Sequence, residues 1–330
     1  YLHGYGAQPQ RLSALEDVET FLGGKGIAKT LKKVLGVELD DFPSYRKFDQ
    51  LILEGEMEPL IFVQPDACLH LKTIHDLSAL GPYFDQMRKG SFYVNSPHTG
   101  NYEDYIIKDV INYVDSNFRT IPSRFNRGMV GVSMGAIGTI NLCAKHPDKL
   151  IAASALSGAP QFVISEYDFL MQLQNPPNLI SGYAKLGLSQ NVMRDYMKKF
   201  WKDVTDTLDL ICSPKEKRLA PTIKEGRDGT ITFDRSAFET YKQNYKKYFV
   251  EYTRNHLEAF KEVHLQLKCH AYDPLAPTVE IFHEILELFK IPHEYELYTG
   301  KKYELSPHVF GCIFELIPAI QFCLKHFQQK

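Results

Sequence analysis

The residues best suited to chemistry lie in Gly-Val-Ser-Met-Gly at 131–135. A Gly-x-Ser-x-Gly pattern between a strand and a helix is typical of a nucleophile elbow, where a strained turn exposes the serine hydroxyl. Glycines on either side let two backbones approach without a Cβ between them. The Val-rich segment before Ser133 predicts a buried strand, and the small residues after it predict a helix over 135–146. We therefore predict that Ser133 is a nucleophile, with a plain strand–turn–helix junction as the alternative.

A serine hydroxyl needs a base to become a nucleophile, and the base needs a carboxylate to orient it. In hydrolases with this elbow, the acid and then the histidine follow the serine along the chain, each after a strand. Asp273 follows an apolar segment that ends at Cys269, and His308 follows another that ends near Tyr298. This order predicts Asp273 as the orienting acid and His308 as the base.

Other titratable residues fit this order less well. Glu304 is the rival of Asp273, but it shares a loop with His308, whereas the orienting acid should follow the preceding strand. The alternative for Asp273, which directly precedes Pro274, is a helix-capping or turn residue. Four further histidines come one element too early, begin a predicted strand or lie within predicted helices, and are interpreted as surface or structural residues: His270, His293, His283 and His326.

Two backbone N–H groups must stabilise the oxyanion that forms when an ester carbonyl is attacked. One comes from the residue after the serine, here Met134, and the other from a glycine-bearing loop after an earlier strand. Residues 1–6, Tyr-Leu-His-Gly-Tyr-Gly, resemble the end of such a strand and such a loop. We predict Tyr5 and Met134 as the oxyanion donors, with a simple glycine-rich turn as the alternative for residues 1–6.

Apolar segments alternate with amphipathic ones along most of the chain, which is typical of an α/β fold with a mostly parallel sheet flanked by helices. The predicted strands are 59–64, 91–94, 127–132, 150–156, 263–269 and 293–298. The predicted helices are 14–22, 44–56, 102–118, 135–146, 278–290 and 309–327, the last bent by Pro318.

Aromatic-rich helical segments interrupt the alternation in the second half of the chain. We therefore predict a core made of residues 1–160 and 261–330, with a largely helical cap inserted at 161–260. Most aromatic rings of the cap are expected to pack it against itself and the core. A minority, with Trp201 and Phe249 as candidates, should face the serine and form an apolar or aryl acyl pocket.

The composition suits a globular protein of one large domain, or a domain with an insert, since the chain has 330 residues of which 44% are hydrophobic and 24% charged. A formal net charge of −2 gives no electrostatic reason to expect nucleic acid or an anionic membrane as partner. The longest apolar stretch, residues 309–324, contains Glu315 and Pro318 and is too short to span a bilayer.

The six cysteines form no Cys-x-x-Cys pair and have no matching histidine cluster, so no zinc site is predicted, and the chemistry implies no other metal or cofactor. Free buried thiols in a reducing compartment are favoured over disulfides, and Cys143 and Cys269 are interpreted as core residues. No signal peptide is visible, but the chain begins at Tyr1 rather than Met, so its N-terminus is interpreted as incomplete. A cytoplasmic location is expected, with secretion left open.

Five motifs follow one another in the outer parts of the chain: Leu-His-Gly at 2–4, Val-Gln-Pro-Asp at 63–66, Gly-Asn-Tyr-Glu-Asp-Tyr at 100–105, Gly-Val-Ser-Met-Gly at 131–135 and Lys-His-Pro-Asp at 145–148. Together they resemble the "Putative esterase" (esterase D-like) family of α/β-hydrolases. That group includes S-formylglutathione hydrolases, feruloyl esterases and mycolyltransferases. The resemblance covers residues 1–160 and 262–327, and the insert matches no family pattern.

The resemblance implies an α/β-hydrolase fold in which Ser133, Asp273 and His308 form a triad and Tyr5 and Met134 hold the oxyanion. The expected function is hydrolysis of small-molecule carboxylic esters through an acyl-enzyme intermediate. An acyltransferase with the same triad, a serine peptidase and a non-catalytic binding protein of the same fold are the alternatives. The acyl group and the oligomeric state stay open.

Overall fold

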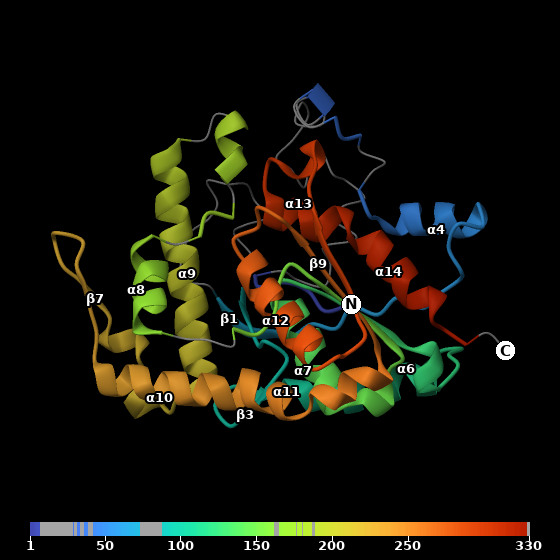
Figure 1. Cartoon of the computed structure of the whole chain (residues 1–330), viewed down its shortest axis with the longest axis horizontal. Coiled ribbons are helices and arrows are strands. Elements are labelled where there is room, and N and C mark those ends of the chain that lie inside the picture. The colour runs from blue at the N-terminus through green and yellow to red at the C-terminus, as the bar shows by residue number, and fades with distance from the viewer. Residues whose placement is uncertain are drawn as a thin grey trace.

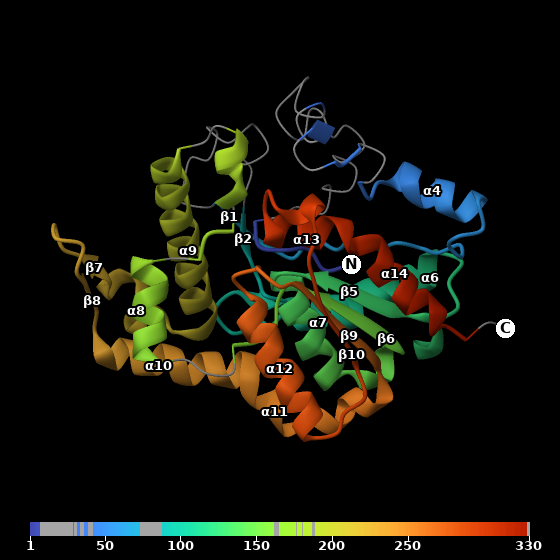
Figure 2. The same cartoon turned by 45° about the horizontal axis from the view of Figure 1, so that its top comes forward.

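The computed structural model describes residues 1–6, 29, 32–33, 36–38, 42–72, 88–161, 165–175, 177–179, 181–186 and 189–328. Its central sheet has four parallel strands in the order β10-β9-β6-β5 (Figure 2). The strands are β5 (Gly128–Val132), β6 (Ala152–Leu156), β9 (His264–His270) and β10 (Glu294–Tyr298). A parallel bridge between Leu2 and Gly131 lies at the β5 edge. These strands confirm the predictions at 127–132, 150–156, 263–269 and 293–298.

Helices cover both faces of this sheet (Figure 1). One face carries α4 (Tyr45–Leu53), α13 (Pro307–Phe314) and α14 (Leu316–Lys325), and the other carries α7 (Met134–Lys145) and α12 (Ala276–Leu288). The side chains of β5 alternate between the two layers, because successive residues of a strand point to opposite faces. Val130 and Val132 pack in the hydrophobic cluster of α13 and α14, whereas Met129 packs in the cluster of α7.

The predicted helix over 102–118 is continuous but contains a π-helical segment. It consists of α5 (Tyr102–Asp104), η5 (Tyr105–Val110) and α6 (Ile111–Asn117). Ile106 and Ile107 bury this helix against the core. In the described part of the chain before it, there are four short strands: β1 (Cys68–Lys72), β2 (Arg88–Gly90), β3 (Asn95–Ser96) and β4 (Gly100–Asn101).

Between β6 and β9, the described residues contribute no strand to the central sheet. Their elements are α8 (Glu166–Gln174), η8 (Ser181–Leu186), α9 (Gln190–Cys212), η9 (Lys215–Lys217), η10 (Ala220–Thr222), β7 (Lys224–Glu225), β8 (Ile231–Thr232), α10 (Arg235–Tyr245), η11 (Lys246–Glu251), α11 (Tyr252–Asn255) and η12 (Leu257–Glu262). In Figure 1, α8, α9 and β7 stand to the left of the sheet, whereas α11 lies below it. There Thr253 donates to Asn141 of α7 at 2.9 Å. The cap boundaries at 161–260 stay a prediction.

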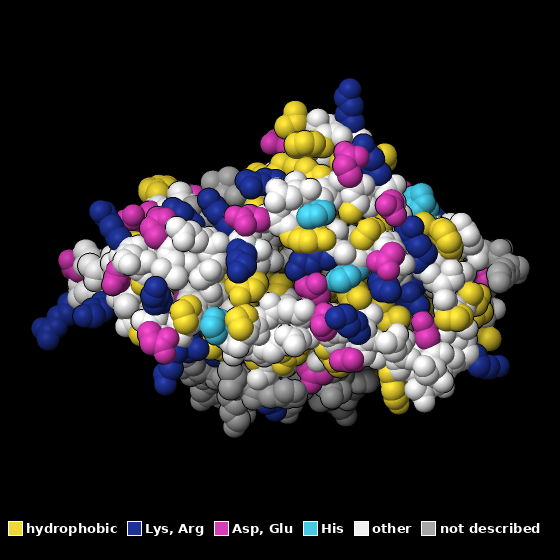
Figure 3. Space-filling model, turned by 90° about the horizontal axis from the view of Figure 1, so that it is seen from below, with side chains coloured by type: hydrophobic (Ala, Val, Ile, Leu, Met, Phe, Trp, Pro, Cys, Tyr) yellow, Lys and Arg dark blue, Asp and Glu magenta, His cyan; other side chains and the backbone are white. Residues whose placement is uncertain are grey.

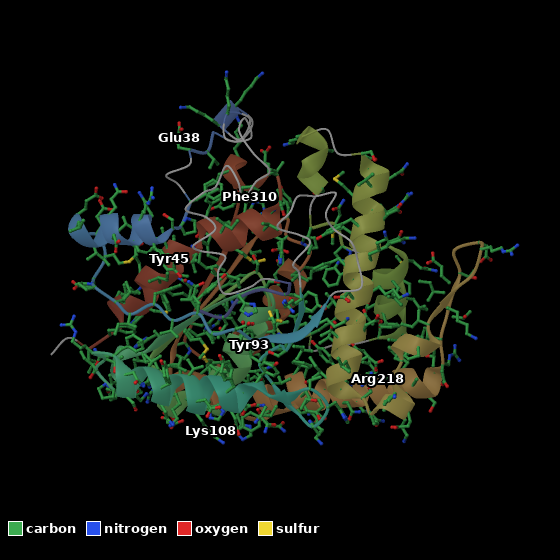
Figure 4. All side chains as sticks on the ribbon, turned by 180° about the vertical axis from the view of Figure 1, so that it is seen from behind. Glu38, Tyr45, Tyr93, Lys108, Arg218 and Phe310 are labelled. Atoms are coloured by element: carbon green, nitrogen blue, oxygen red, sulfur yellow. The ribbon has the colours of Figure 1, made fainter. Side chains whose placement is uncertain are left out.

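The predicted strand over 91–94 is wrong, because this segment turns. Phe92 and Tyr93 have φ of 54° and 59°, which excludes an extended strand. The Tyr93 hydroxyl donates to the carbonyl of His3 at 3.0 Å, and a Cβ on Gly138 of α7 would lie 2.5 Å from the Tyr93 ring. Figure 4 shows Tyr93 in the middle of the molecule. Burial of the turn thus explains an apolar run that contains no strand.

Two other predicted elements of the N-terminal part have different outcomes. The strand predicted over 59–64 is absent, since these residues join no sheet among the described residues. The ammonium of Tyr1 donates to the carbonyl of Val63 in this segment at 2.8 Å. The helix predicted over 14–22 lies outside the described residues.

The predicted bend of the last helix at Pro318 is wrong, because the bend lies at Glu315 instead. α13 and α14 meet at 41° on either side of Glu315. Pro318 lies in the first turn of α14, where its missing N–H removes no helical hydrogen bond. The buried Glu315 carboxylate lies 2.5 Å from the ammonium of Lys268 on β9 and accepts a hydrogen bond from Tyr303. A buried polar cluster therefore holds the bend.

The described surface and helices agree with the composition. No single helix in the described ranges is long and apolar enough to cross a membrane. α13 and α14 together have the length and the apolar composition of such a helix, but they are bent by 41° where they meet. On the face shown in Figure 3, Lys and Arg are interspersed with Asp and Glu. All six cysteines are free thiols, and five of them are buried, as predicted.

Removing the charge of Glu315 is expected to destabilise the fold. In Glu315→Gln the buried Lys268 ammonium keeps only the more exposed Glu296 at 2.9 Å, and breaking a buried pair costs about 3–5 kcal/mol. Glu294→Gln is the matched control, because its pair with Lys325 is half exposed and such pairs contribute about 0–1 kcal/mol. Urea unfolding measures both losses, and equal losses would contradict the role given to Glu315.

Candidate active site

Ser133 occupies a strained turn between β5 and α7. Its φ of 54° and ψ of −116° define a backbone conformation that non-glycine residues avoid unless the surrounding structure imposes it. The surroundings are backbone contacts: a Cβ on Gly131 would lie 2.0 Å from the carbonyl oxygen of Gly135. A Cβ on Gly135 would lie 2.0 Å from the carbonyl oxygen of Leu2. The two glycines of the predicted motif thus permit the close packing that the turn requires.

His308 lies between Ser133 and Asp273. Its Nε2 is 2.9 Å from Ser133 Oγ, and its Nδ1 is 2.9 Å from Asp273 Oδ2. The two ring partners come from the carboxyl end of β5 and from the loop after β9, whereas His308 lies in the first turn of α13. His308 is 6% exposed and Asp273 is 3% exposed, so water reaches little of the pair. The structure brings together the three residues that the sequence singled out.

The hydrogen bonds define the tautomer of His308. An ionised carboxylate only accepts hydrogen bonds, so Nδ1 carries a proton that it donates to Asp273. Nε2 of the neutral ring then has a lone pair that accepts from the Ser133 hydroxyl. This is the proton arrangement in which a histidine can take a proton from a serine.

Asp273 stays ionised although it is buried. Burial alone would raise the pKa of its carboxyl, but His308, the N–H of Leu275 and the Ser157 hydroxyl outweigh this effect and lower the pKa. The Leu275 N–H donates at 2.8 Å. Ser157 is fully buried and follows β6, the neighbour of β9 in the sheet. No role was predicted for Ser157 from the sequence, although its position at a strand end was a signal that could have suggested one.

The first turn of α13, which carries His308, is anchored to the cap. Ser306 caps this helix by accepting from the N–H of Val309 at 3.2 Å. Its own hydroxyl donates to the carbonyl of Leu179. A Cβ on Gly182 would lie 2.2 Å from the carbonyl oxygen of Glu304, so this segment packs directly on the loop before His308. The backbone of the predicted cap therefore contacts the loop and the helix cap that directly precede the predicted base.

The two predicted oxyanion donors flank Ser133. Met134 is the first residue of α7, and the N–H of a first helical residue has no acceptor within the helix. The loop that carries Tyr5 is close to the serine, since a Cβ on Gly4 would lie 3.4 Å from the Cβ of Ser133. The side chains of Met134 and Tyr5 both face Gly90 of β2, where a Cβ would come within 2.1 Å and 3.2 Å of them.

A buried polar network joins the Tyr5 side chain to helix α9. The Tyr5 hydroxyl donates to Asp203 Oδ2 at 2.6 Å and also lies 2.6 Å from Thr207 Oγ1. The other carboxylate oxygen of Asp203 is 2.6 Å from the ammonium of Lys89 on β2. Lys89, Asp203 and Thr207 are all buried. No local sequence pattern pointed to this network, because its members are far apart in the chain and meet only in the fold.

The rival residues and the predicted pocket residues have other partners. Trp201 is buried and donates to the carbonyl of Pro177 at 2.8 Å. Phe249 is buried against Phe92 and Tyr245. A role for Trp201 and Phe249 in substrate binding stays a prediction.

The residues that rival the predicted acid and base each have another partner: His270 packs on Tyr298, His283 bonds to His293, His326 stacks on His264, and Glu304 pairs with Lys185.

A family model described as "Putative esterase" matches residues 39–227, which is more than half of the chain. The chain belongs to this family. The family inferred from the motifs is thereby confirmed, and with the helix-flanked parallel sheet the predicted α/β-hydrolase fold class is confirmed as well. The expected extent of the resemblance differs, because the matched range continues to residue 227 and so includes the first part of the predicted insert. The matched range includes Ser133 but ends before Asp273 and His308. The association of these two residues with Ser133 therefore rests on the hydrogen-bond geometry alone.

Several solved structures are similar to this esterase-family chain. A ferulic acid esterase is 15% identical with a TM-score of 0.48, and the alignment covers 99% of this chain and 84% of that one. A fluorophosphonate-binding serine hydrolase of Staphylococcus aureus is 21% identical with a TM-score of 0.35, covering 65% and 62%. An S-formylglutathione hydrolase from the same organism is 17% identical with a TM-score of 0.32, covering 65% and 63%.

Asp206, one turn after Asp203 on α9, is predicted to make stability depend on pH. Burial raises the pKa of its carboxyl from 3.8 to about 6, against the opposing charges of Lys89 and Lys202. The folded state therefore holds this proton more tightly than the unfolded state does. The stability that the proton provides is present below pH 4 and is lost as the pH rises through about 6.

Asp206→Asn should accordingly be more stable than the parent protein at pH 8, by on the order of 1 kcal/mol because solvent screens this half-buried group. The advantage should shrink steadily as the pH falls from 7 to 4. Urea unfolding at these pH values measures it, and Asp195→Asn, on an exposed site of the same helix, should change stability little at any of them. An advantage of equal size at pH 4 and pH 8 would contradict the burial argument.

Proposed function

We propose that this member of the esterase family is a serine hydrolase that cleaves small carboxylic esters. Ser133, His308 and Asp273 are its catalytic triad. The observation that carries the proposal is the continuous pair of 2.9 Å contacts from Ser133 through His308 to Asp273. Membership of the family supports the same reaction class.

In the acylation half of the proposed reaction, Ser133 Oγ attacks the ester carbonyl carbon while His308 Nε2 takes the hydroxyl proton. The ionised Asp273 stabilises the imidazolium that forms. The carbonyl oxygen becomes an oxyanion that accepts hydrogen bonds from the N–H groups of Tyr5 and Met134. Collapse of this intermediate expels the alcohol, which takes the proton from Nε2, and leaves an acyl group on Ser133.

Deacylation repeats these steps with water as the nucleophile. His308 Nε2 takes a proton from water as it attacks the acyl carbonyl, and then returns the proton to Ser133 Oγ as the carboxylic acid leaves. An alcohol in place of water would give an acyltransferase with the same residues. A serine peptidase would act on amides, and a binding protein of this fold would form no acyl-enzyme.

Ser133→Ala is expected to lower kcat for p-nitrophenyl acetate by at least about 10⁴-fold and to abolish labelling by a fluorophosphonate probe, because no nucleophile remains. The circular dichroism spectrum should not change. Labelling of the parent protein distinguishes the enzymes from a binding protein, and added alcohol acceptors distinguish ester hydrolysis from acyl transfer.

Since the triad acts as a unit, His308→Ala and the double variant with Ser133→Ala should be about as impaired as Ser133→Ala alone. His326→Ala, whose ring stacks on His264 instead, is the control histidine and should keep near-parental activity. Full activity in Ser133→Ala or in His308→Ala would refute the proposed triad.

We further propose that the insert at 161–260 is a lid that sets acyl specificity. The contact between Leu179 and Ser306 supports this, as does the network that ties α9 to Tyr5, because both reach the surroundings of Ser133. The insert follows β6 at the carboxyl end of the parallel strands, where ligands bind in α/β sheets. It is also rich in aromatic residues, which can form an apolar pocket.

Trp201→Ala and Phe249→Ala should then change the rank order of activity on p-nitrophenyl esters from acetate to octanoate and on methyl cinnamate, while activity on acetate is spared. Apolar pockets discriminate by about 1–3 kcal/mol per methylene. Tyr167→Ala removes a ring of α8 that is 70% exposed, and it serves as the control. A uniform loss across all esters would indicate that the insert is only structural.

A further inference from the structure

A cluster of three metal-binding side chains lies outside the candidate active site. His283 and Glu287 are one turn apart on α12, and His293 precedes β10. One ligand atom from each of them lies within 4.8 Å of the other two. Both histidines are half-buried and Glu287 is exposed, so a small ion can reach the cluster from solvent.

The hydrogen bonds of His293 direct a lone pair into this cluster. Its Nδ1 lies 2.8 Å from the carbonyl oxygen of Ile291, and a carbonyl only accepts, so Nδ1 carries the proton. Nε2 of the neutral ring is therefore an acceptor, and it lies 2.8 Å from His283 Nδ1. An imidazole whose second nitrogen donates to a backbone carbonyl is the arrangement that holds histidine ligands in metal sites.

The His283 ring is held in place as well. It stacks on Tyr295 of β10 with ring centroids 3.8 Å apart and an angle of 11° between the planes. With the ring in this position, its Nδ1 faces Nε2 of His293. The carboxylate of Glu287, one helical turn further along α12, lies near both nitrogens. The two nitrogen ligands are thus oriented before any ion binds, which lowers the entropy lost on binding.

We propose that His283 Nδ1, His293 Nε2 and a Glu287 carboxylate oxygen bind a divalent transition-metal ion, with Zn²⁺ as the best match. Two imidazoles and one carboxylate are a known zinc ligand set, and water completes the coordination. On binding, the proton of His283 moves from Nδ1 to Nε2 by exchange with solvent, so both rings stay neutral. The nitrogens separate from 2.8 Å to about 3.3 Å, the spacing that tetrahedral Zn–N bonds require.

The position of the site indicates a structural role. Ser133 and Asp273 follow the carboxyl ends of β5 and β9, whereas the metal ligands lie where α12 turns back into β10, at the amino end of that strand. In Figure 2, α13 with His308 lies above the sheet and the turn between α12 and β10 lies below it. A bound ion would join the end of α12 to the start of β10 and stabilise the folded chain by linkage.

To test this, the protein is treated with EDTA, desalted and titrated at pH 7.5. Zn²⁺ binding is measured by calorimetry, and Co²⁺ binding is measured by visible absorption. The expected result is one saturable site per chain, a Co²⁺ spectrum of low coordination number, and a Tm that rises with Zn²⁺ concentration. His283→Ala, His293→Ala and Glu287→Gln should each weaken binding at least about tenfold. His264→Ala, whose ring stacks on His326 away from the cluster, should bind as the parent does.

Absence of saturable binding up to millimolar Zn²⁺ would overturn the proposal. Unchanged binding in the double variant His283→Ala, His293→Ala would overturn it too, because the ion would then lie elsewhere, for example at the His3, Asp66 and Cys68 cluster. Glu287→Gln changes an exposed side chain, so it keeps the test decisive even where a histidine variant is unstable. None of these measurements depends on esterase activity, so the metal site and the proposed function succeed or fail separately.

Discussion

The direct backbone packing of β5, α7 and the Leu2–Gly4 segment around Ser133 is the constraint on which the site depends. A side chain at Gly131 or Gly135 would collide with a carbonyl oxygen 2.0 Å away. The packing imposes a positive φ on Ser133 and holds its hydroxyl at the end of the sheet. It also brings the first N–H of α7 beside the loop of Tyr5, so that the nucleophile and both proposed oxyanion donors come from one contact.

The remaining members of the site arrive because parallel strands end at the same edge of a sheet. Asp273 follows β9, whereas α13 brings His308 over that edge. Buried polar side chains then refine these positions: Ser157 bonds the Asp273 carboxylate, and the Lys268–Glu315 pair holds the break between α13 and α14. Burial makes such groups costly unless they are paired, so each pair restricts the position of its backbone.

The cap takes part in this arrangement through two long-range contacts. Leu179 accepts from Ser306 beside the base, and Asp203 of α9 binds both Tyr5 and Lys89. One side of the site is thus supported at the histidine and the other at the oxyanion loop. In the opposite direction, the turn from α12 to β10 carries the proposed metal ligands away from the chemistry.

From the sequence alone, the order of the four central strands with the helices that follow them, and the residues Ser133, Asp273 and His308, were predictable, because apolar periodicity and strand-end positions are local properties. The strand wrongly predicted over 91–94 and the bend wrongly assigned to Pro318 were not, because in both places tertiary burial decided the backbone. The same holds for the Tyr5–Asp203 network and the His283–His293 pair. Their members share no local pattern, and only the folded chain brings their polar groups within hydrogen-bond distance.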